Sequence, residues 1–142
     1  MAYLTPEQLE KFKNQIKHVI EQLPELKENM NSAEDWNELN DWLRNFAMAF
    51  HLVSDLCEIA LEIISEMWPL TEAEQDDMIV KALDDLITLP FVLEPFDGMA
   101  IRYIVTSVRK MFKTKGYIPR DIKRQVAIQE AISMYKGEIK NE

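Results

Sequence analysis

The sequence predicts an all-α protein, folded as a single-domain bundle of about five helices with one long central helix. Three observations support this prediction. The chain has 142 residues, of which 47% are apolar, so it is long enough to build one hydrophobic core. It contains three glycines, whereas strand-rich folds need many tight turns. Apolar residues recur at intervals of three and four along most of the chain, which is the spacing of one helix face.

The first helix is predicted to begin after Thr5. The sequence Thr-Pro-Glu-Gln supplies a capping residue, a proline at the first helical position and Gln8 at the third. The apolar stripe continues beyond Pro24, which interrupts a regular helix, so we expect a kink or a short break there. The stripe consists of Leu9, Phe12, Ile16, Val19, Leu23, Leu26 and Met30.

The long central helix is predicted over about residues 33–68, between a capping Ser32 and Pro69. Its apolar seam runs for more than four heptads, so it should bury a wide face. Unbroken, it would be about 54 Å long, whereas a compact domain of this size is about 40 Å across. We therefore expect an elongated bundle or a break near Asn45. The seam comprises Trp36, Leu39, Leu43, Phe46, Phe50, Val53, Cys57, Ala60, Ile64 and Met67, with Cys57 interpreted as a small buried apolar residue.

Three further helices are predicted over about residues 71–89, 97–115 and 119–137. Glu72 and Glu74 lie in the first turn of the third helix, where the helix dipole favours acidic residues, so they support a start at Thr71. Gly116 and Gly137 are interpreted as the ends of the last two helices. The inward side of the last helix is assigned to Ile122, Val126, Ile128, Ile132 and Tyr135.

The connector before the fourth helix, residues 89–98, reads LPFVLEPFDG and is unusually apolar for a loop. Its two prolines lack backbone donors, which makes burial of an extended segment less costly. We expect Phe91, Leu93 and Phe96 to close one end of the bundle. If they are exposed instead, they become a candidate interface for a partner.

Charge is unevenly distributed along the chain, whose net charge is −9. Residues 1–100 hold 21 acidic and 6 basic side chains, whereas residues 101–142 hold 4 acidic and 10 basic ones. The basic end could offset the acidic helices, within one molecule or between two, or it could bind nucleic acid, another anion or an anionic membrane surface. The overall acidity opposes nucleic-acid binding, and the acidic part could instead imitate DNA. The candidate anion-binding residues are Arg109, Lys110, Lys113, Lys115, Arg120, Lys123 and Arg124.

Signals for enzymatic chemistry are weak. The chain has no glycine-rich phosphate loop and no HExxH or CxxC motif. Asp55-x-x-Glu58 and Glu74-x-x-Asp77 are similar in outline to the paired acidic turns that hold Mg²⁺ in all-α nucleotide pyrophosphatases, which implies a Mg²⁺-dependent nucleotide hydrolase as an alternative. However, Asp55, Glu58 and Glu62 fall opposite the apolar seam, which favours a solvated acidic face. We assign no catalytic residue, metal or cofactor.

The remaining interpretation is a non-catalytic helical module for protein–protein interaction, with a regulatory or accessory role. Its support is the long apolar seam together with eight Met and three Trp, residue types that suit interfaces. We expect a protein partner or self-association. The N-terminus has no signal-peptide pattern, and the most apolar window, residues 46–67, contains four acids, so we expect no transmembrane segment and a cytoplasmic location.

Overall fold

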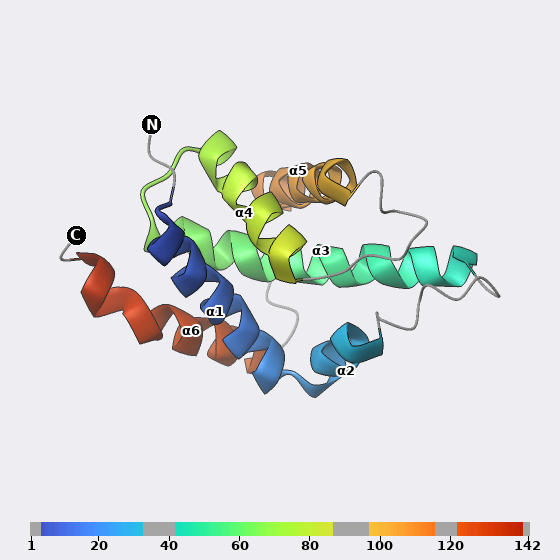
Figure 1. The fold of residues 1–142 in the computed structure, drawn as a ribbon, viewed down its shortest axis with the longest axis horizontal. Coiled ribbons are helices and arrows are strands. Elements are labelled where there is room, and N and C mark those ends of the chain that lie inside the picture. The colour runs from blue at the N-terminus through green and yellow to red at the C-terminus, as the bar shows by residue number, and fades with distance from the viewer. Residues whose placement is uncertain (1–3, 33–41, 87–96, 116–121, 141–142) are drawn as a thin grey trace.

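The computed structural model describes residues 4–32, 42–86, 97–115 and 122–140. These residues form six helices and no strands, which confirms the all-α prediction (Figure 1). The sixth helix arises because the first apolar stripe is divided in two. The helices are α1 (Pro6–Gln22), α2 (Pro24–Ser32), α3 (Trp42–Met67), α4 (Glu72–Leu86), α5 (Asp97–Lys115) and α6 (Ile122–Lys140).

The division between α1 and α2 confirms the predicted effect of Pro24. Leu23 leaves the helical conformation, and α2 restarts with the proline at its first position. The start of α1 also matches the prediction. The Gln8 N–H donates to Thr5 Oγ1 at 3.1 Å, and the Thr5 N–H donates to Gln8 Oε1 at 2.9 Å, which completes a capping box.

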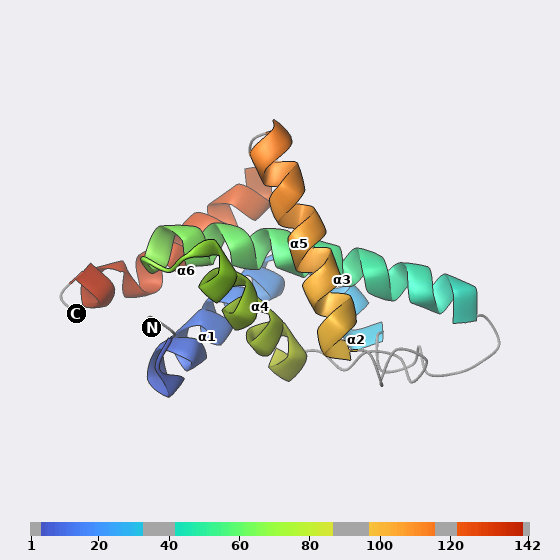
Figure 2. The ribbon, with the colours of Figure 1, turned by 90° about the horizontal axis from the view of Figure 1, so that it is seen from above.

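Helix α3 runs unbroken through Asn45, so of the two alternatives the one with a break near Asn45 is wrong. Its 26 residues correspond to about 39 Å, a length that fits a domain of this size. The predicted residues 33–41 of the central helix lie outside the described residues. Figures 1 and 2 show α3 crossing the molecule, with its N-terminal end extending past α4 and α5.

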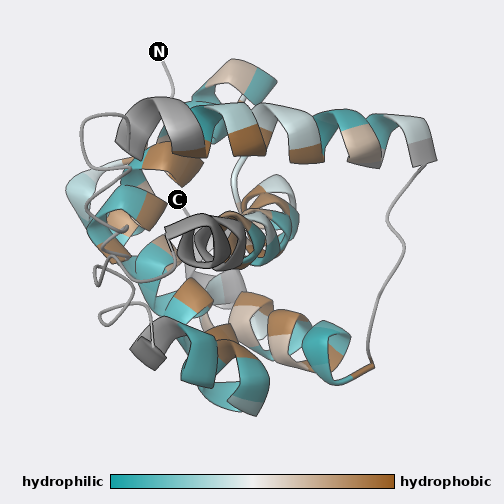
Figure 3. Cartoon of the chain, turned by 90° about the vertical axis from the view of Figure 1, so that its right-hand side faces the viewer, coloured by the Kyte–Doolittle hydropathy of each residue, from teal (hydrophilic) through white to brown (hydrophobic). Residues whose placement is uncertain are grey.

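The core surrounds α3, which packs against α1, α4, α5 and α6. In Figure 3, α5 is the upper helix and turns its hydrophobic side towards α3. At one end of the core, the rings of Phe12 and Trp68 meet edge to face with centroids 5.8 Å apart. The largest fully buried side chains are Phe12, Ile16, Leu52, Leu56, Ile59, Ile63, Ile64, Ile79, Leu83, Ile101, Ile128 and Ile132.

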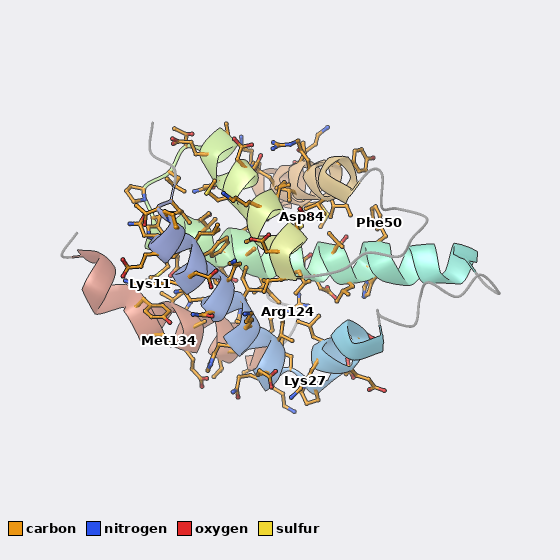
Figure 4. The ribbon with its side chains drawn as sticks, in the orientation of Figure 1. Lys11, Lys27, Phe50, Asp84, Arg124 and Met134 are labelled. Carbon is orange, nitrogen blue, oxygen red and sulfur yellow. The ribbon has the colours of Figure 1, made fainter. Side chains whose placement is uncertain are left out.

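Burial confirms the predicted seam from Val53 to Met67 and departs from it at Phe50. The seam residues Trp36, Leu39, Leu43 and Phe46 lie outside the part of the chain whose burial is described. Cys57 is buried, as predicted. Phe50 is 42% exposed and lies on the part of α3 that extends past α5 (Figure 4). Gly137 does not end the last helix, since α6 continues to Lys140. An interior glycine costs a helix only about 1 kcal/mol, which helix propensity and packing elsewhere can offset.

The apolar connector with Phe91, Leu93 and Phe96 lies outside the described residues, and so does Arg120. None of the described helices combines the length and the apolar character needed to cross a membrane.

Candidate functional site

Three basic side chains of α5 contact acidic side chains of α4: Arg102, Arg109 and Lys113. Arg109 donates from Nε to Asp76 Oδ1 at 2.9 Å and from Nη2 to Gln75 Oε1 at 2.8 Å. The Arg109 side chain is 14% exposed and that of Asp76 is 16% exposed, so this ion pair is largely shielded from water. Arg102 adds an outer pair by donating from Nη2 to Asp77 Oδ1 at 2.6 Å. These contacts hold α5 against α4.

Glu72 lies at the start of α4 and completes this network. It accepts a hydrogen bond from Lys113 Nζ at 2.7 Å, and Arg109 Nη1 lies 3.4 Å from its other carboxylate oxygen. The hydrogen bond from Lys113 is the main reason why the pKa of the Glu72 carboxyl is lowered. Two predicted anion-binding residues, Arg109 and Lys113, are therefore paired with acids of the same chain.

Arg124, a third predicted anion-binding residue, lies at the start of α6 and contacts α3. Its Nη1 donates to Glu58 Oε2 at 2.9 Å, and its Nη2 lies 3.1 Å from Asp55 Oδ1. The side chains of Arg124, Asp55 and Glu58 are 14%, 11% and 12% exposed. The predicted solvated acidic face is therefore wrong at Asp55 and Glu58, because α6 covers both carboxylates and supplies their cation.

The four predicted metal ligands are distributed over three places. Asp55 and Glu58 meet at Arg124, and Asp77 pairs with Arg102. Glu74 accepts the Thr71 N–H at 2.9 Å, and the Glu74 N–H donates to Thr71 Oγ1 at 3.3 Å, so the two residues form a capping box at the start of α4. Within the described ranges, no three His, Cys, Asp or Glu side chains are grouped so that they could hold a metal ion.

The other predicted anion-binding residues lie at the surface or outside the description. Lys110 is exposed on α5, and Lys123 is exposed on the first turn of α6. The side chain of Lys115 and all of Arg120 lie outside the described residues. The described cations are thus largely used within the molecule, as one of the sequence interpretations proposed.

A polar cleft of about 370 Å³ lies beside Arg124, between the start of α2, the turn of α3 from His51 to Asp55, and the start of α6. His51 Nε2 is 3.5 Å from Asp55 Oδ2, and the His51 side chain is mostly exposed. Glu25 and Asn29 of α2 line the opposite wall. The described lining offers hydrogen-bonding and ionic groups but contains no Ser, Thr or Cys that could act as a nucleophile.

The outer side of α6 carries large apolar residues that are partly exposed to solvent. Ile122, Val126 and Met134 are 77%, 51% and 44% exposed. The prediction that Ile122 and Val126 face inward is therefore wrong. The inward side is instead formed by Ala127, Ile128, Ala131 and Ile132, with Tyr135 half-buried beside them. Arg124 and Met134 are labelled in Figure 4.

The two apolar sides of α6 were visible in its spacing. Residues four apart share a helix face, so Ile122 pairs with Val126 and Ile128 pairs with Ile132. A shift of two residues separates Val126 from Ile128 and turns the helix by about 200°, which places the two pairs on opposite sides. A shallow open hollow follows the outer side, lined by Gln125, Val126, Gln129, Glu130, Ser133 and Met134.

Comparisons of this chain with protein-family models, with curated proteins and with solved structures found no match.

Proposed function

We propose that this chain is a non-catalytic helical interaction module that binds a protein partner through the outer face of α6. This face is defined by Ile122, Gln125, Val126, Gln129, Glu130, Ser133 and Met134. The observation that carries the proposal is the two-sided character of α6. One apolar side completes the core, and the opposite side presents three large apolar side chains to solvent.

Ile122, Val126 and Met134 leave apolar surface in contact with water. Burying a large apolar side chain completely contributes roughly 1.5–3 kcal/mol, and these three are each about half exposed or more. A partner that covers them would gain on the order of 1 kcal/mol from each. Single exposed apolar residues are normal on protein surfaces, but three large apolar side chains exposed on one helix, with Ile122 and Val126 one turn apart, suit the docking of another helix.

The charge network supports the same proposal. Three of the predicted anion-binding residues donate hydrogen bonds to acids of the same chain: Arg109, Lys113 and Arg124. Fewer cations are therefore available to bind phosphate or nucleic acid. The outer face of α6, in contrast, is mostly apolar and amide in character, as the centres of protein interfaces are.

Site-specific photo-cross-linking in cells that make the protein tests this proposal. A benzophenone side chain in place of Val126 should yield a protein adduct of defined mass. The same side chain in place of Thr106, which is exposed on α5, serves as the matched control and should not yield that adduct. The proposal is overturned if Val126 gives no adduct, or the same adducts as Thr106.

A further inference from the structure

We propose that α6 is a strap that undocks from α1 and α3 as a unit, while the other helices of the core stay packed together. The cluster of Arg124, Asp55 and Glu58 is the latch that holds this strap closed. Figure 1 shows α6 at the edge of the molecule, on the side of α3 away from α4 and α5. The opening goes beyond the proposed function, since it does not depend on which partner the outer face binds.

The apolar contact that holds α6 is small for a helix of 19 residues. Among the residues whose burial the structure describes, the apolar side chains that α6 buries are Ala127, Ile128, Ala131 and Ile132, with Tyr135 as partial cover. Helix α5 also has 19 residues and buries only larger, branched side chains, namely Ile101, Ile104, Val105 and Val108. Hydrophobic stabilisation scales with the apolar area removed from water, and an alanine contributes only a methyl group. Hydrophobic burial therefore holds α5 more firmly than α6.

The rest of the contact between α6 and the core is polar. The ion pairs of Arg124 with Asp55 and Glu58 must first offset the cost of removing three charges from water. Gln15 of α1 is fully buried and donates from Nε2 to the Ala131 carbonyl at 2.9 Å. Its Oε1 accepts no hydrogen bond within the described part of the chain, which costs free energy while α6 is docked. Undocking hydrates all these groups, so it costs less than opening an apolar contact.

The other helices keep contacts in which α6 has no part. Helix α1 also packs against α3 and α4, where Phe12 meets the edge of Trp68 and Lys13 pairs with Asp85. Helix α5 packs against both α3 and α4. An opened α6 therefore leaves a core of α1, α3, α4 and α5 in place. Partial openings of this kind occur where an element buries little apolar surface.

Opening changes the surface that α6 offers to a partner. The docked helix presents its outer face, whereas the undocked helix also exposes Ile128 and Ile132 on the opposite side. A partner that encloses both apolar sides binds only the open form and shifts the equilibrium towards it. Its apparent affinity is reduced by the small fraction of molecules that are open. The latch therefore sets how tightly such a partner binds.

Thiol labelling measures the opening. Ile128→Cys puts a thiol on the buried side of α6, and Ile104→Cys puts a matched thiol on the buried side of α5. The native Cys57, buried in α3, is the reference in both proteins. With each rate divided by its value in denaturant, the thiol at position 128 should label at least about tenfold faster than Cys57. The thiol at position 104 should label at a rate close to that of Cys57. Equal rates at positions 128 and 57 overturn the inference.

A core variant distinguishes undocking from global unfolding. Ile104→Ala, made in the Ile128→Cys protein, removes packing of α5 and should raise the labelling rate of Cys57 by roughly thirtyfold or more. The rate at position 128 should stay constant, because the docked and undocked forms lose the same packing. Any other pattern, above all a parallel rise of both rates, overturns the inference. Ile104→Val makes the same comparison with a milder loss if Ile104→Ala does not fold.

The latch is tested in the same Ile128→Cys protein. Arg124→Met leaves two buried carboxylates without their cation only while α6 is docked, so the rate at position 128 should rise at least about tenfold. Arg102→Met removes an ion pair between α5 and α4 and should leave that rate unchanged. An unchanged rate with Arg124→Met overturns the assignment of the latch. If the photo-cross-link at Val126 captures a partner but position 128 labels no faster than Cys57, the opening fails and the proposed function stands.

Discussion

Arg124 and Glu58 are 66 residues apart in the chain and are joined by a 2.9 Å hydrogen bond from Nη1 to Oε2. The pair connects the first turn of α6 to the middle of α3 and is largely buried together with Asp55. A basic residue that suggested anion binding and two acids that suggested metal binding or a solvated face are thus members of one internal cluster.

Removal of the cation from this cluster should be costly. Arg124→Met leaves the Asp55 and Glu58 carboxylates buried without their guanidinium, so we expect a loss on the order of 3 kcal/mol in the free energy of unfolding. Arg102→Met, which breaks the more exposed pair with Asp77, should cost less than about 1 kcal/mol. Urea unfolding of the two variants measures the difference. Equal losses would mean that burial of the Arg124 cluster adds nothing to stability.

Truncation of Phe12 should open a cavity in the core. Its ring is fully buried against the edge of Trp68, so Phe12→Ala should lower the free energy of unfolding by about 3–5 kcal/mol. Phe12→Leu retains most of the volume and should cost clearly less. Thermal or urea unfolding monitored by tryptophan fluorescence checks this order. A loss below about 1 kcal/mol for Phe12→Ala would show that the core closes around the missing ring.

The thiol of Cys57 should be unreactive in the folded protein. Burial raises its pKa well above the ordinary value, so the reactive thiolate is scarcely populated, and the surrounding side chains also block access. Labelling with an alkylating reagent at neutral pH should therefore proceed only as fast as the protein unfolds. The rate should rise to that of a free thiol in denaturant. Rapid labelling under native conditions would contradict the buried position.

The stabilising effect of Glu72 should depend on pH. Its pKa is lowered in the folded state, mainly by the hydrogen bond from Lys113, so the unfolded chain binds a proton more readily than the folded one. The contribution is present above the unfolded pKa, for which the ordinary value is 4.5, and is lost as pH falls through the folded pKa. Unfolding of wild type and Glu72→Gln should therefore differ at neutral pH and converge in acid.

A matched control separates this effect from general acid destabilisation. Glu66 is exposed at the end of α3 and has no ion pair among the residues that the structure describes. Glu66→Gln therefore controls for the loss of one exposed charge. If Glu72→Gln lowers stability at neutral pH no more than Glu66→Gln does, the hydrogen bond from Lys113 does not contribute to folding.

The sequence by itself determined the local features of this protein. The cap at Thr5, the restart at Pro24, the start of α4 at Thr71 and the burial of Cys57 follow from rules that act within a few residues or along one helix face. The charge distribution also predicted that the basic residues of the segment 101–142 could neutralise the acidic helices. It did not indicate which acid each basic residue would contact.

Only the tertiary structure decided the partners of the charged residues and the direction of each face. Asp55 and Glu58 lie opposite the apolar seam of α3. They are nevertheless covered by α6, because Arg124, which is distant in the sequence, forms ion pairs with them. Val126 has the same apolar character as the residues of the core, yet it faces solvent because Ala127, Ile128 and Ala131 provide the side that packs on α1 and α3. Long-range packing selects one of two apolar sides, and spacing along a single helix carries no information about that choice.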